Sequence, residues 1–107
     1  MGISQVQAEV RQATQAASSL QDLTQITTEM IAQAVSLSRN TTSQYLNELL
    51  KQRQVVQIKS RPTYFADREA FSAQFFAPKL DVYASLEELE HEQVRHNNVF
   101  KAFIGSD

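Results

Sequence analysis

Residues 27–52 read TTEMIAQAVSLSRNTTSQYLNELLKQ and predict two helices joined by a tight turn. Thr27 is a suitable N-cap for the first helix, and Ile26 is placed to pack on Ile31 as a hydrophobic staple. The Ser-Leu-Ser that follows breaks the apolar pattern, and its last residue, Ser38, can cap the second helix. Helical spacing predicts two buried faces: Met30, Ile31, Ala34 and Val35 in the first helix, and Thr42, Tyr45, Leu46, Leu49 and Leu50 in the second.

The residues after this helix pair predict a β-hairpin. β-Branched and aromatic residues at 55–59 and 63–66 flank a short break that contains Pro62, which cannot donate to a β-ladder and therefore suits a loop. Lys59 and Arg61 fall near the hairpin tip. The order helix, helix, turn, helix, hairpin is typical of a winged helix-turn-helix. The predicted fold class is therefore mainly α with a small β-hairpin wing.

The register of the helix pair also fits the general helix-turn-helix pattern. Ala32 takes the small position of the first helix, and Ser36 falls where glycine is commonest in the turn. Leu37, Thr42 and Tyr45 take the next buried positions. A basic hairpin directly after such a pair favours a DNA-binding unit over an ordinary pair of amphipathic helices.

The second helix, expected over residues 38–52, has a polar outward face suited to the major groove. That groove admits one helix, and side chains near the N-terminus of the helix read the base edges. Arg39 can form a bidentate pair with guanine, whereas the amides can pair with adenine and the hydroxyls can contact phosphate. The candidate DNA-binding residues are Ser38, Arg39, Asn40, Thr41, Ser43, Gln44, Asn47, Lys51, Lys59 and Arg61. The alternative is a winged helix that binds or dimerises with protein and touches no DNA.

Composition sets further bounds. A chain of 107 residues is expected to form one domain, and the lack of cysteine excludes disulfides and thiolate chemistry. The net charge of −2 hides an asymmetry: residues 36–61 carry five basic and one acidic side chain, whereas residues 69–107 carry three basic and seven acidic ones. A local basic segment can bind nucleic acid without a basic total. Without a secretion signal or an apolar run of ~20 residues, we expect a cytoplasmic protein and no membrane partner.

Helical patterns also flank the central segment. An apolar stripe near the N-terminus predicts either a helix packed on its own domain or part of a dimer seam: Ile3, Val6, Val10, Ala13, Ala17 and Leu20. Asp67 can cap a short helix with Phe71 and Phe75 on one face. Ser85 and Glu88 form a capping box for another helix, with Leu86, Leu89 and Val94 inward. The chain ends with an apolar group made of Val99, Phe100, Phe103 and Ile104.

No motif predicts catalysis, a metal or a cofactor. His91 and His96 are five positions apart, one too many for the zinc-protease motif, and do not share a helix face. The acidic residues Glu87, Glu88, Glu90 and Glu92 are expected to form a solvated helix face. The chain has no glycine-rich phosphate loop. We therefore expect no enzymatic activity from these residues.

Residues 27–71 resemble the N-terminal region of LevR-type regulators, which are bacterial sigma-54-dependent transcriptional activators controlled by the sugar phosphotransferase system. The final residues 99–107, VFKAFIGSD, are similar to the opening of the ATPase module of that family. The resemblance implies a DNA-binding domain over residues 1–76 and a helical linker over 77–107 that leads to an AAA+ ATPase outside this chain. It implies double-stranded DNA and a homodimer or higher oligomer as partners, and the sigma-54 RNA polymerase holoenzyme as a partner of the other domains only.

Overall fold

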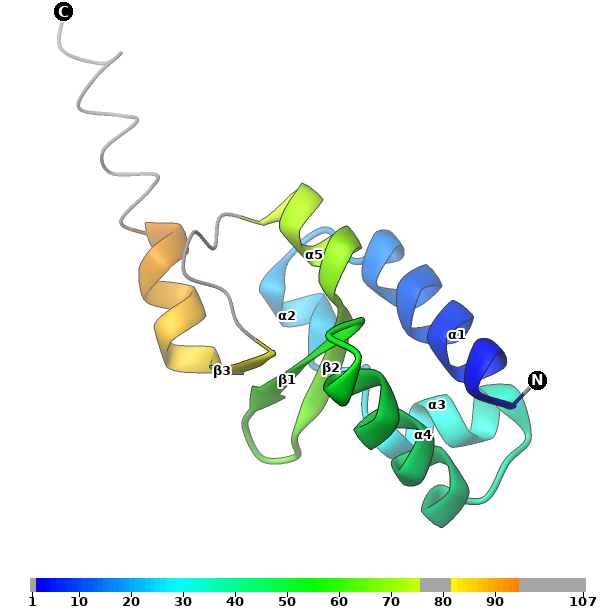
Figure 1. The fold of residues 1–107 in the computed structure, drawn as a ribbon. Helices are drawn as coiled ribbons and strands as arrows, with labels where there is room; N and C mark the ends of the chain where they lie inside the picture. Colours follow the sequence, from blue (N-terminus) through cyan, green and yellow to red (C-terminus); the bar gives the residue numbers. More distant parts are fainter. Residues whose placement is uncertain (1, 76–81, 95–107) are drawn as a thin grey trace, which may run out of the picture.

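A computed structural model describes residues 2–75 and 82–94 as mainly helical with a small sheet (Figure 1). Four helices come first, then a hairpin, a short helix, a third strand and a helix over residues 86–94. Their bounds are α1 Gly2–Ala16, α2 Leu20–Leu23, α3 Thr28–Val35, α4 Arg39–Lys51, β1 Val55–Lys59, β2 Tyr64–Asp67, α5 Arg68–Gln74 and β3 Tyr83–Ser85. The predicted helix pair and hairpin are thus present, and the apolar group at 99–104 lies outside the described residues.

The predicted caps of the helix pair are confirmed. The Thr27 hydroxyl accepts from the Met30 N–H at 3.2 Å, and the Ser38 hydroxyl accepts from the Thr41 N–H at 3.1 Å. Ser36 follows α3 with φ 58° and ψ 40°, a left-handed conformation that favours glycine. The N–H groups of Ser36 and Leu37 donate back to carbonyls of α3, which closes a Schellman motif. The turn therefore demands at Ser36 the backbone geometry for which glycine is commonest.

The sheet has the order β2-β1-β3. β1 and β2 form the expected antiparallel hairpin, in which Ile58 lies opposite Tyr64. β3 pairs parallel with β1, so that Ser85 lies opposite Lys59. This strand was not predicted, because a parallel pairing depends on a distant partner and three residues carry too little pattern to show it. The expectation of a helical linker from residue 77 is therefore wrong at Tyr83–Ser85, although the division into domain and linker remains a prediction.

The core lies between α1 and the rest of the chain (Figure 1). Val6, Val10 and Ala17 are buried against α3, α4 and the hairpin, so the apolar stripe packs on its own domain. The helix ends at Ala16, short of the predicted end of the stripe. The next helix, α2, begins at Leu20. Its Asp22 carboxylate accepts hydrogen bonds from the N–H and the hydroxyl of Ser18, just before the helix, and these bonds lower the pKa of Asp22.

Two predicted buried positions are wrong. Ala34 is exposed, whereas Ala32 is buried, because the two lie about 200° apart around the helix. Val94 is 57% exposed, since the helix over 86–94 turns its Leu89 inward and Val94 follows about 140° away from it. The other predicted core positions of α4 are buried or half-buried, with Tyr45 packed at the edge of the core.

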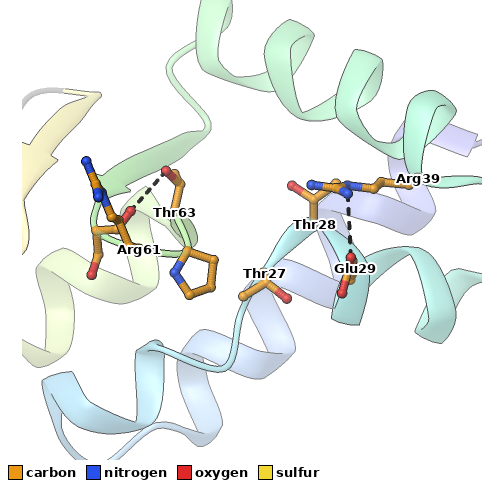
Figure 2. Close-up of a pocket in the computed structure, with 8 residues that line it drawn as sticks. Thr27, Thr28, Glu29, Arg39, Arg61 and Thr63 are labelled. Carbon is orange, nitrogen blue, oxygen red and sulfur yellow. Dashed lines mark hydrogen bonds and ion pairs between the residues drawn. The ribbon is translucent and has the colours of Figure 1, made fainter.

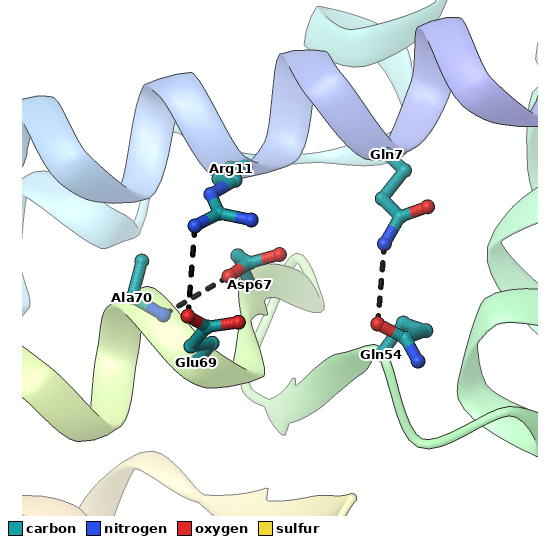
Figure 3. Close-up of polar contacts among 6 residues, drawn as sticks. All are labelled: Gln7, Arg11, Gln54, Asp67, Glu69 and Ala70. Atoms are coloured by element: carbon teal, nitrogen blue, oxygen red, sulfur yellow. Dashed lines mark hydrogen bonds and ion pairs between the residues drawn. The ribbon is translucent and has the colours of Figure 1, made fainter.

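One buried hydroxyl joins α1 to the end of the hairpin. Thr14 is fully buried; its hydroxyl donates to the Val10 carbonyl at 2.7 Å and accepts from the Asp67 N–H at 2.8 Å. The Asp67 carboxylate in turn accepts from the Ala70 N–H at 3.0 Å, the predicted cap of α5 (Figure 3). Two exposed contacts also join α1 to the rest of the chain, Gln7 with Gln54 and Arg11 with Glu69 (Figure 3). No helix among the described residues is long and apolar enough to cross a membrane.

Replacing Thr14 with valine should lower the free energy of unfolding by about 1–3 kcal/mol, because the Asp67 N–H would stay buried without an acceptor. Urea denaturation followed by circular dichroism measures this. Thr24→Val is the matched control, since the Thr24 hydroxyl also donates to a backbone carbonyl but at an exposed position. Equal losses in both variants would contradict the special role of Thr14.

Replacing Ser36 with glycine should raise the free energy of unfolding by about 1 kcal/mol, because glycine adopts the left-handed conformation without a Cβ penalty. The same denaturation experiment tests it. Ser72→Gly, in the exposed middle of α5, should have the opposite sign, because glycine is a poor helix former. A destabilised Ser36→Gly variant would show that the turn is not strained by its side chain.

Candidate nucleic-acid interface

The polar residues predicted on α4 form one outward face. Asn40, Gln44, Asn47 and Lys51 follow helical spacing and are exposed, as is Arg39 at the start of the helix. Ser38 is exposed, and Thr41 and Ser43 are half-buried beside this face. The opposite face is buried, as predicted, through Thr42, Leu46, Leu49 and Leu50. The helix therefore separates its packing residues from its polar ones.

The loop of the hairpin, residues 60–63, lies beside the start of α3. The Phe65 N–H donates to the Ile26 carbonyl at 2.9 Å, and Thr27 forms an isolated bridge with Tyr64. The Thr63 hydroxyl closes the loop by donating to the Ser60 carbonyl at 3.4 Å. These backbone pairings bring the loop to the N-terminal ends of the helix pair.

A groove separates this loop from the helix pair (Figure 2). Its volume is about 460 Å³, and Figure 2 shows Arg61 on one side and Glu29 and Arg39 on the other; Pro62 also lines it. The remaining lining residues are Thr27, Thr28, Ser60 and Thr63. Two arginines that were predicted separately, Arg39 on α4 and Arg61 on the hairpin loop, thus line the same groove.

Arg39 is not a free guanidinium. Its Nη1 lies 3.5 Å from Oε1 of Glu29, and both side chains are mostly exposed, at 74% and 70%. Glu29 was not predicted as part of the site. Its place in the first turn of α3 was the clue in the sequence that Glu29 could meet Arg39. The turn at 36–38 reverses the chain, so that the start of α4 lies near the start of α3.

The other predicted basic residues, Lys51 and Lys59, do not line the groove. Lys59 ends β1 and is exposed, and Lys51 lies at the opposite end of α4, about 18 Å along the axis from Arg39. Within the described part of the chain, Lys51, Lys59 and Arg61 form no salt bridge. Their charges are therefore available to an anionic partner.

Acidic residues border the basic surface on one side. Because Ser85 pairs with Lys59, the helix over 86–94 begins beside the point where the hairpin loop, residues 60–63, starts. It carries Glu87, Glu88, Glu90 and Glu92. The surface that carries Lys59 and Arg61 thus has acidic residues beside it at β3, and it continues toward α4 on the other side.

Two further side chains, Tyr64 and His91, lie apart from the groove lining. The Tyr64 hydroxyl is buried with no hydrogen-bond partner among the described residues; burial and the charge of Glu90 raise its pKa to about 12, so it stays protonated at neutral pH. His91 is exposed on the last helix, and His96 lies outside the described residues. No group of three or more histidine, aspartate or glutamate residues in the described ranges could hold a metal ion.

Comparison with known proteins gives no match: no family model, no curated protein and no solved structure is similar to this chain.

Proposed function

We propose that this chain is a winged helix-turn-helix that binds DNA in a sequence-specific manner, as part of a bacterial transcriptional regulator. In this proposal α4 enters the major groove and the wing, residues 55–66, lies on the sugar-phosphate backbone. One observation carries it: Arg39 at the start of α4 and Arg61 on the wing loop line a common groove, next to the exposed polar face of α4.

The helix supplies groups for reading bases. Arg39 lies at the N-terminal end of α4, where a helix of this kind approaches base edges most closely. Its guanidinium can donate to O6 and N7 of guanine, and the amides of Asn40, Gln44 and Asn47 can pair with adenine. Ser38 already caps the helix, so its hydroxyl is committed to the Thr41 N–H and has less freedom to bind phosphate.

The wing supplies charge without sequence information. Lys59 and Arg61 can each neutralise a phosphate, and each such contact releases counterions and steepens the salt dependence of binding. Lys51, at the far end of α4, can reach the sugar-phosphate backbone on the other side of the DNA major groove. A surface with these three charges and a polar helix suits duplex DNA better than an apolar protein partner.

The resemblance to LevR-type sigma-54-dependent activators belongs to the same proposal. In this proposal the unit belongs to a cytoplasmic activator of sugar phosphotransferase or catabolic operons, whose AAA+ ATPase would act on the sigma-54 holoenzyme. A dimer would read two half-sites. Since Val6 and Val10 are buried within the chain, the contact between the two copies of a dimer would use another surface, such as that near the exposed Tyr83 and Val94.

The second candidate is a winged helix that docks on protein and does not bind DNA. The Glu29–Arg39 ion pair and the acidic helix over 86–94 favour it, because both reduce the positive charge near the wing. Selection from a pool of random 20-base-pair duplexes, followed by titration at several salt concentrations, separates the two. Without salt-sensitive binding at ~10⁻⁴–10⁻⁶ M, only the protein-docking candidate would stand.

Arg61→Ala should weaken binding to the selected duplex and to its scrambled version alike, and should reduce the salt slope by about 1, because one phosphate contact is lost. Fluorescence anisotropy titrations over a range of salt measure both quantities. Arg11→Ala is the control, since it removes the same charge from α1. A loss confined to the selected duplex would contradict a backbone role for Arg61.

Arg39→Ala should cost about 1–3 kcal/mol on the selected duplex and relax the preference at one base pair, because a bidentate base contact is lost. Titration against duplexes substituted at each position identifies that base pair. Equal effects on selected and scrambled duplexes would show that Arg39 binds phosphate and reads no base.

A further inference from the structure

Glu29 has no evident task in holding the fold together. Its ion pair with Arg39 is 3.5 Å long and exposed on both sides, and such pairs contribute little to stability because water and ions compete for each partner. A carboxylate in the first turn of α3 also interacts favourably with the helix dipole, but any acidic residue there would do so. What distinguishes Glu29 is its position inside the groove.

Of the eight residues that line the groove, Glu29 is the acidic one. A phosphate drawn in by Arg39 and Arg61 would also approach the Glu29 carboxylate, and the two negative charges repel each other. A base edge carries no net charge and does not meet this repulsion. The charge of Glu29 therefore disfavours a phosphate in the groove more than it disfavours a base edge.

Arg39 can exchange partners at low cost. The guanidinium has five N–H donors, and the ion pair with Glu29 is longer than the 2.7–2.9 Å typical of a strong charge-assisted hydrogen bond. A guanine offers two acceptors in the geometry that a guanidinium fits. Either exchange leaves the Glu29 carboxylate without its cation. Exchange for phosphate in addition places that carboxylate beside a second anion, whereas a guanine edge carries no net charge.

We propose that Glu29 is a specificity-determining residue: it penalises phosphate contacts of Arg39 more than base contacts, and so suppresses binding to unrelated DNA. This inference rests on the proposed DNA-binding function. Glu29 acts here through Arg39 and is a positioning residue, since it is not itself the group that recognises the base.

The test is Glu29→Gln, measured as dissociation constants for the selected duplex and for its scrambled version at the same salt concentration. Affinity for the scrambled duplex should rise about threefold to tenfold, as expected for removal of one like charge near the phosphates in high dielectric. Affinity for the selected duplex should change less, so that the ratio of the two falls. In an Arg39→Ala background, the gain on scrambled DNA should shrink.

Glu69→Gln is a closely matched control. Glu69 is also the second residue of a helix and also pairs with an arginine of another helix, Arg11, at 3.6 Å (Figure 3). It lies on α5 against α1 and does not line the groove. This variant therefore gives the effect of the same change in net charge alone, and melting curves check that both variants are folded.

The outcomes separate the inference from the function on which it rests. No salt-sensitive binding of the unmodified chain to any duplex overturns both. Binding by the unmodified chain, with the same specificity ratio in Glu29→Gln as in Glu69→Gln, overturns the role of Glu29 and leaves the DNA-binding function intact. An undiminished gain in the Arg39→Ala background overturns the role through Arg39.

Discussion

The position of the wing depends on a short backbone pairing. The Ile26 carbonyl accepts from the Phe65 N–H, and Thr27 bridges to Tyr64, directly before Thr27 caps α3. One residue thus ends the pairing with β2 and begins the helix pair. Because backbone groups make this connection, the wing loop keeps its place beside α3 whichever side chains it carries. The groove between the loop and the helix pair is a product of that constraint.

The residues that hold the fold together differ from those that we propose to bind DNA. α1 covers the helix pair and the hairpin, and its Thr14 hydroxyl ties β2 and α5 to it through buried hydrogen bonds. On α4, Leu46 and Leu49 face that core while Gln44 and Asn47 face solvent. Substitutions on the outward face should therefore alter binding with little effect on folding, which makes the function testable by mutation.

The sequence predicted what is local and missed what depends on distance. The caps at Thr27, Ser38 and Asp67 involve residues three positions apart, so their pattern is visible in one short window. The hairpin is also a neighbouring pair. β3 and the Glu29–Arg39 pair were missed, since the first joins residues far apart and the second depends on the exact path of the turn. The polar face of α4 was predicted correctly as a surface, and its function remains a proposal.

The parallel pairing of β3 with β1 couples two parts of the surface mechanically. Ser85 lies opposite Lys59, so the helix that starts at residue 86 and the strand that leads into the wing loop are joined side by side. A lateral load on that helix is shared by the pairs between β1 and β3 and by the buried Leu89, and the strand pairs transmit their part to the wing. Three residue pairs make a short seam, and we expect it to part before the four pairs of the hairpin do. The wing would then keep its shape while its acidic neighbour moved away.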